Sequence, residues 1–139
     1  MGIIVLISCS SKKLSQKAKA RDLYISPLFQ LNLKYAQQLS PQKVFILSAK
    51  YGLLQLDEEI EPYDVTLNEM TAHERRNWAA KVVLQLQEHC DLVNDYFVIL
   101  AGQKYRQYLV PYLKLYKIPL AGLPIGKQLQ FLKESLRNE

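Results

Sequence analysis

The sequence predicts a three-layer α/β domain, with a mostly parallel sheet of about four strands and helices on both of its faces. Three observations predict this class. Short apolar runs without polar alternation are typical of strands that are covered on both faces, and helical patterns separate these runs. The length of 139 residues suits one ordinary domain. We therefore expect a single α/β domain over residues 1–139.

Four apolar runs are the candidate strands. Three of them are nearly continuous and contain the β-branched residues that favour a strand over a short helix, and the fourth is weaker. The four runs are 3–7, 44–47, 96–100 and 118–120.

Helical patterns lie between these runs. Ser26 can cap a helix that has Pro27 at its first position. Residues 71–74 have the form of a capping box, and we expect the helix that follows to continue to about Cys90. Two more helices are expected over about 103–115, with a kink or break at Pro111, and over about 126–137.

The net charge of +5 is unevenly distributed. Residues 1–50 carry eight Lys or Arg against one acid, residues 51–70 carry six acids and no base, and residues 71–139 carry ten bases against six acids. Positive charge favours phosphates and other anions as partners. The acidic segment is longer than normal connections, so it is either functional or contains short elements. We expect it to fold over the same end of the sheet as the first lysines.

The composition also limits partners and cofactors. No stretch approaches the roughly 20 consecutive apolar residues that a membrane span needs, and we expect a cytoplasmic protein without a membrane partner. Cys9 and Cys90 are interpreted as free thiols, and no local motif of His and Cys suits zinc. We expect no bound metal and no cofactor, and the oligomeric state stays open.

Three predicted strand ends combine small residues with a lysine. In open parallel sheets, ligands bind beyond the carboxyl ends of the strands, where loop amides converge. Small side chains let backbone N–H groups approach a ligand, serines donate hydrogen bonds and lysine neutralises an anion. A solvated turn or a solvated basic face is the alternative for each loop. The candidate ligand-binding residues are Ser8, Ser10, Lys12, Ser48, Lys50, Tyr51, Gly52, Gly102, Lys104 and Tyr105.

Lys13 and Cys9 are candidate catalytic groups at the first strand end. A lysine amine attacks carbonyls or nitriles in its neutral form, which a neighbouring cation such as Lys12 favours. Nearby lysines would likewise favour a thiolate at Cys9, although a small apolar filler is the alternative for this cysteine. The choice between Lys12 and Lys13 as the inward-facing lysine stays open.

The acidic segment supplies a third catalytic candidate, Asp64. Pro62 fixes one backbone dihedral, so the chain can present Tyr63 and Asp64 with little entropy to lose. Tyr63 is a candidate ligand-binding residue that can stack on a base, and Asp64 can orient a ribose hydroxyl or a base edge. An exposed acidic loop with a structural tyrosine, or a carboxylate that pairs with the basic loop, is the alternative.

Several of these elements resemble, in the same order, the YaaA-type peroxide-stress family. The resemblance is carried by residues 46–54 (Ile-Leu-Ser-Ala-Lys-Tyr-Gly-Leu-Leu), by Glu61-Pro-Tyr63 and by residues 99–105. The whole chain resembles a short bacterial and phage family of that superfamily, which implies stress response and DNA binding. A fainter resemblance, from Cys9 to Lys13, is to the amidine-forming domain of archaeosine synthase, whose lysine attacks the nitrile of a deazaguanine base.

Two functions of different classes follow. The first is an enzyme that acts on a nucleobase, a nucleotide or the end of a DNA or tRNA, as a lysine-dependent transferase or lyase with Lys13 as nucleophile or anion clamp. The second is a non-catalytic DNA-binding protein of the peroxide-stress response, whose basic first third contacts phosphates. A purely structural or partner-binding domain is the third interpretation.

Overall fold

The central layer of the protein is a five-stranded sheet. In the computed structural model, which describes residues 2–137, the strand order is β4-β3-β1-β6-β7. Four strands run parallel and the edge strand β4 is antiparallel to its neighbour, so the predicted three-layer α/β class is confirmed. The strands are β1 (Ile3–Ser8), β3 (Lys43–Ser48), β4 (Gly52–Gln55), β6 (Tyr96–Leu100) and β7 (Leu115–Lys117).

The apolar runs lack polar alternation because both faces of the sheet are covered. Along β1, Ile4 and Leu6 pack into the core on one face, and Val5 and Ile7 pack into the core on the other. All four side chains are fully buried. The central strand therefore satisfies the pattern of a parallel strand between two helical layers.

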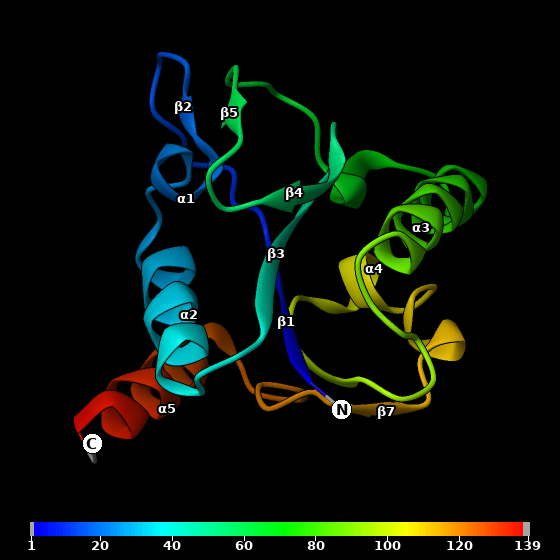
Figure 1. Cartoon of the computed structure of the whole chain (residues 1–139). Coiled ribbons are helices and arrows are strands. Elements are labelled where there is room, and N and C mark those ends of the chain that lie inside the picture. The colour runs from blue at the N-terminus through cyan, green and yellow to red at the C-terminus, as the bar shows by residue number, and fades with distance from the viewer. Residues whose placement is uncertain (1, 138–139) are drawn as a thin grey trace.

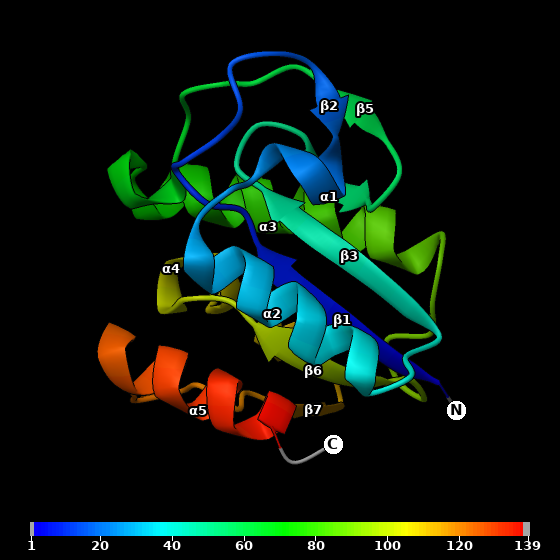
Figure 2. The ribbon, with the colours of Figure 1, turned by 90° about the vertical axis from the view of Figure 1, so that its left-hand side faces the viewer.

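Helices form the two outer layers (Figures 1 and 2). The helices α2 (Pro27–Gln38) and α5 (Ile125–Arg137) lie together on one face. The other face carries α3 (Ala72–Gln87) and the short α4 (Gln103–Arg106). Within residues 2–137, the structure contains no helix with the length and apolar character needed to cross a membrane.

Two predicted helix starts are confirmed by their caps. Ser26 Oγ accepts a hydrogen bond from Phe29 N–H at 3.2 Å, with Pro27 at the first helical position. Thr71 and Glu74 exchange the two hydrogen bonds of a capping box. The end of α3 lies at Gln87, a few residues before the predicted end at Cys90.

The predictions for residues 103–120 need correction. The expected helix over 103–115 is α4 followed by a short 3-10 turn, η2 (Val110–Tyr112), with Pro111 inside this turn. The expected strand at 118–120 is wrong, because the strand is β7, just before it. β7 is an edge strand that pairs with β6, and its last two residues are exposed, so it lacks the continuous apolar pattern of a covered strand.

The acidic segment contains short elements that the sequence did not predict. After β4, β5 (Glu59–Ile60) pairs with β2 (Ala18–Lys19), and the turn η1 (Leu67–Glu69) precedes α3. The β2–β5 pair and α1 (Ala20–Leu23) form a small unit beyond the carboxyl ends of the strands, at the top of Figure 1. Two ion pairs connect basic residues of the first third to the acidic segment, Arg21 to Asp57 at 2.9 Å and Lys17 to Glu59 at 3.9 Å.

The edge strand β4 is protected by side chains. Leu53 N–H donates to Gln85 Oε1 at 2.9 Å, and Gln55 N–H donates to Glu58 Oε1 at 3.1 Å. Such bonds satisfy donors that an edge strand would otherwise offer to another chain. Gly52 begins this strand with a φ of 76°, the left-handed conformation that favours glycine.

We expect Gly52→Ala to lower the free energy of unfolding by at least about 1–2 kcal/mol, the cost of a left-handed L-residue. The added Cβ would also clash with Gln85 Oε1, which caps Leu53. Gly126→Ala in α5 is the control, because open space surrounds that position, and alanine should stabilise the helix by up to about 1 kcal/mol. Urea unfolding measures both changes, and equal effects of the two variants would contradict this account of Gly52.

Candidate functional site

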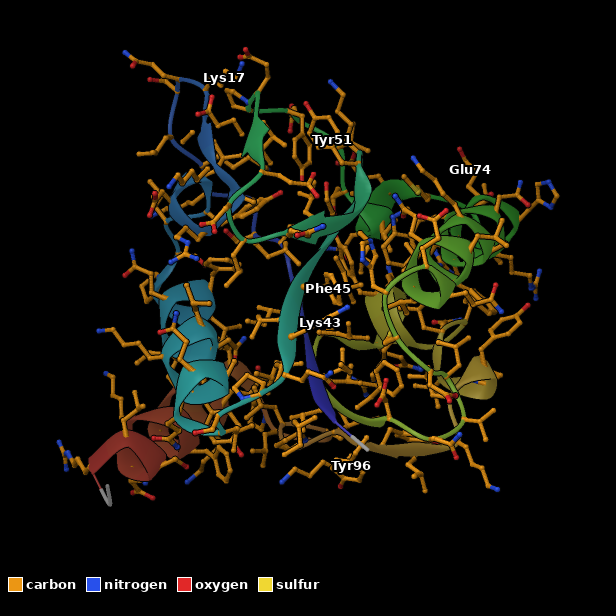
Figure 3. The ribbon with its side chains drawn as sticks, in the orientation of Figure 1. Lys17, Lys43, Phe45, Tyr51, Glu74 and Tyr96 are labelled. Atoms are coloured by element: carbon orange, nitrogen blue, oxygen red, sulfur yellow. The ribbon has the colours of Figure 1, made fainter. Side chains whose placement is uncertain are left out.

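The candidate site lies beyond the carboxyl ends of β1 and β6. The chain leaves β1 toward β3 and leaves β6 toward β7, which lies on the other side. Ligands of open α/β sheets bind at such a topological switch point. In Figure 3, Tyr51 and Tyr96 lie at opposite ends of the sheet, and the site lies at the end of Tyr51.

A cavity of about 290 Å³ at this end gathers residues from three separate segments. This volume is near the lower limit for small-molecule sites, and it suits one ring system better than a dinucleotide. We call it the Lys13 cavity. The predicted site residues that line it are Cys9, Ser10, Lys13, Asp64 and Tyr105.

Other hollows of the surface are less suited to be the site. One of about 270 Å³ lies beside Lys43 and Gln55, and a wider one of about 560 Å³ lies beside Gly2 and Asp95. Both lie away from the carboxyl ends of β1 and β6, where the loops of a parallel sheet converge.

Tyr105 is the most constrained residue of the Lys13 cavity. Its buried ring contacts Trp78 edge-on, with 5.8 Å between the ring centroids. Its hydroxyl accepts hydrogen bonds from Cys9 Sγ at 3.6 Å and from Leu67 N–H at 3.4 Å. Burial is the largest cause that raises the pKa of Tyr105 to about 12, so the phenol stays protonated to a higher pH than an exposed tyrosine. The Thr66 side chain, which lines the same cavity, is a further hydrogen-bond partner of this hydroxyl, so a ligand that binds Tyr105 competes with Thr66.

Lys13 is the lysine of the first loop that reaches the cavity. Its main chain pairs with Tyr24 in an isolated antiparallel bridge, and its side chain is half-buried, whereas Lys12 is exposed. Lys13 Nζ lies 4.5 Å from the centroid of the Tyr63 ring. A cation–π contact stabilises an ammonium group. Of the two roles predicted for Lys13, this contact favours the anion clamp over the nucleophile.

A chain of hydroxyl groups fixes Tyr63 behind Lys13. Ser48 is fully buried, and its Oγ accepts a hydrogen bond from Tyr51 N–H at 3.0 Å and donates one to Tyr63 at 2.8 Å. The hydroxyls of Tyr63 and Tyr24 are 2.6 Å apart. Burial is the largest cause that raises the pKa of both tyrosines well above its usual value. Tyr63 therefore supports Lys13, and its hydroxyl is already used.

The remaining predicted residues lie outside the Lys13 cavity. Ser48 is fully buried and bonded to Tyr63, Gly52 is the first residue of β4, and neither lines the Lys13 cavity. Tyr51 packs edge-on against Tyr63, and Lys50 Nζ lies over the Tyr51 ring. Ser8 and Gly102 line a second, smaller cavity. Lys12 is exposed. At the rim of the Lys13 cavity, Lys104 Nζ donates a hydrogen bond to Asn68 O at 3.4 Å.

Sequence reasoning missed part of the cavity lining. Thr66, Asn68 and Glu69 line it from the segment that leads into η1, and Ser11 lines it from the first loop. Thr66 Oγ1 accepts a hydrogen bond from Asn68 N–H at 3.2 Å and caps that turn. Residues 66–69 have the same Thr-x-x-Glu spacing as the capping box at 71–74, and this signal could have predicted the turn.

Comparison with known proteins gives one match. A family model described as a family of unknown function (DUF6884) matches residues 4–134, which include every residue of the Lys13 cavity. No curated protein and no solved structure matches the chain. The resemblances to the YaaA-type family and to archaeosine synthase stay predictions.

We expect the free energy of unfolding to fall as the pH rises above about 10. Burial raises the pKa values of Tyr24 and Tyr63 in the folded protein. Above about pH 10 the unfolded chain therefore loses tyrosine protons that these two residues retain in the folded protein. The unfolded state binds fewer protons, so a higher pH destabilises the fold. Tyr24→Phe should make this fall shallower, as measured by urea unfolding on both sides of pH 10. Tyr116→Phe, at an exposed position, should keep the wild-type slope, and identical slopes for all three proteins would contradict the prediction.

Proposed function

Because this chain belongs to the DUF6884 family, whose function is unknown, we propose a function from the geometry of the Lys13 cavity: an enzyme that acts on a nucleobase or nucleoside. The observation that carries the proposal is the meeting of four different groups in one cavity at the switch point. They are the ammonium of Lys13, the carboxylate of Asp64, the thiol of Cys9 and the phenol of Tyr105.

The charges of the lining favour a neutral ring over a phosphate. Asp64 and Glu69 contribute two carboxylates against the single ammonium of Lys13, so a phosphate inside the cavity would be repelled by two of three charges. A nucleobase edge instead offers acceptors to Lys13 Nζ and Tyr105 O–H, and N–H donors to Asp64. The volume of about 290 Å³ is consistent with one such ring system.

A phosphate attached to the ligand would lie at the rim. Lys104 Nζ is bonded to the main chain of Asn68, which lines the cavity, and the Lys104 side chain is exposed. Lys12 is exposed beside Lys13. These two lysines are placed to hold the phosphate of a nucleotide, or of a DNA or tRNA end, whose base occupies the cavity.

The lining groups support acid–base chemistry more directly than attack by lysine. Burial raises the pKa of Tyr105 to about 12, so the phenol keeps its proton and stabilises a reacting atom by donating a hydrogen bond. Asp64 is an exposed carboxylate on the same cavity and can accept a proton. Lys13 holds developing negative charge. Cys9 donates to Tyr105, so we assign the thiol to orienting that phenol.

General binding of duplex DNA is less well supported. Lys17 and Arg21, which belong to the basic first third, are paired with Glu59 and Asp57. These pairs cancel charge that would otherwise meet phosphates. Binding through the remaining lysines would depend steeply on salt, which separates it from binding of a neutral ring.

A thermal-shift screen of nucleobases, nucleosides and deazapurines tests the proposal. We expect at least one of these compounds to stabilise the wild type, with little dependence on salt. Lys13→Ala should weaken that binding by about tenfold or more, equivalent to about 1.4 kcal/mol. Lys12→Ala is the matched control, because it removes the same charge from the neighbouring exposed position and should bind like the wild type.

The proposal fails if no compound in the screen stabilises the wild type. It also fails if Lys12→Ala and Lys13→Ala weaken binding equally. If duplex DNA then binds both variants with the same steep dependence on log salt, the non-catalytic DNA-binding function is the better description.

A further inference from the structure

A second cavity, of about 50 Å³, lies at the same strand ends on the side of α2 and α5. It shares no lining residue with the Lys13 cavity. We call it the Asn32 cavity. The polar residues that line it are Ser8 at the end of β1, Asn32 on α2, Gly102 after β6, Arg106 on α4 and Gln128 on α5.

Asn32 occupies a core position of α2 where an apolar side chain would be expected. It is 3% exposed, and the other buried residues of this helix are Phe29, Tyr35 and Ala36. Its Oδ1 is buried and has no hydrogen-bond partner within residues 2–137. An unsatisfied buried polar group is destabilising, and a molecule that donated a hydrogen bond to this amide would remove that cost. Asn32 differs from the other buried, unpartnered amide of α2, Gln38, because Asn32 lines a cavity.

The neighbouring polar groups are held by the main chain. Arg106 Nη1 donates to Ala101 O at 2.8 Å, and Gln128 Nε2 donates to Leu123 O at 2.8 Å. With Nε2 engaged, the carbonyl oxygen of Gln128 is the part of that amide suited to accept from a ligand. The guanidinium of Arg106 disfavours a cationic ligand by repulsion, and the amide oxygens of Asn32 and Gln128 call for a hydrogen-bond donor rather than an anion. The cavity therefore suits a neutral group that carries a donor.

We propose that the Asn32 cavity is a second binding site, for a neutral group with an N–H donor beside an acceptor. A primary carboxamide and the amino edge of a heterocycle both have this chemistry, and an asparagine amide pairs with such an edge through two hydrogen bonds. A volume of about 50 Å³ holds roughly three to four water molecules, which is the size of a carboxamide group. No residue of the Lys13 cavity contributes, so this second site is independent of the proposed function.

Acetamide and acetone are the first pair of probes, because they have nearly the same shape and only acetamide has N–H donors. In NMR spectra of the ¹⁵N-labelled full chain, we expect acetamide to shift the side-chain amide of Asn32 and the main-chain N–H of Gly102, and acetone to leave both unchanged. Adenine and purine form the second pair, in which only adenine carries an amino group. A response to adenine alone identifies the heterocycle edge as the ligand, and a response to acetamide identifies the carboxamide.

Variants of α2 complete the test. Asn32→Leu should abolish the response of Gly102, and it should not lower the melting temperature, because an unpartnered buried oxygen is removed. Gln38→Leu is the matched control: Gln38 Oε1 is also buried without a partner in the described chain, but Gln38 does not line the cavity, so the response should persist. Lys13→Ala should also keep the response, which separates this site from the Lys13 cavity.

Two outcomes would overturn the second site. If no probe shifts Asn32 or Gly102 in the wild type, the cavity holds water only. If Asn32→Leu responds to the probes as the wild type does, the amide is not what binds them. If Asn32→Leu does not fold, the wild type still tests the second site, because acetamide is compared with acetone and adenine with purine on the same protein.

Discussion

Ser48 joins three parts of the chain to the end of β3, and the Lys13 cavity depends on these bonds. Its main-chain oxygen accepts a hydrogen bond from Trp78 Nε1 at 2.8 Å, which fixes α3 against the sheet. Its hydroxyl bonds to Tyr51 N–H and to Tyr63. Without Tyr63, the hydrogen of this fully buried hydroxyl would lose its acceptor, at a cost of about 1–3 kcal/mol, so Ser48 favours the observed position of Tyr63. With Tyr63 fixed, the next residue, Asp64, lies beyond the strand ends and meets Lys13 in one cavity.

The uneven charge of the chain is partly resolved by the small unit beyond the strand ends. Two basic residues of the first third, Lys17 and Arg21, pair with carboxylates of the acidic segment. Each pair is largely exposed and contributes little to stability. Their larger effect is on the surface charge, because they neutralise cations that are not near the cavity. Lys12 and Lys104 remain exposed next to residues that line the cavity, so both are available to an anion at its rim.

The parts of the fold that follow from the sequence are those with strong local signals. The strands β1, β3 and β6 were predictable because burial on both faces requires continuous apolar runs. Strands of two to four residues at edges, such as β4 and β5, have too few positions to form a pattern. Among the candidate residues at the strand ends, Lys13 and Tyr105 line the cavity, and their role as site residues stays a prediction. Local sequence did not predict that Ser48 turns inward, because its burial depends on Tyr63, fifteen residues away.

The end of β1 separates the two cavities at the switch point. Consecutive residues of an extended chain point to opposite sides, and Ser8 lines the Asn32 cavity whereas Cys9 lines the Lys13 cavity. This strand end is held on both sides: β1 pairs with β3 and β6, and Cys9 N–H donates to Leu47 O at 3.0 Å. Coupling between two sites requires an element with two arrangements that both ligands bias. A strand end bonded on both sides is poorly suited to that role, so the two cavities should bind their ligands independently.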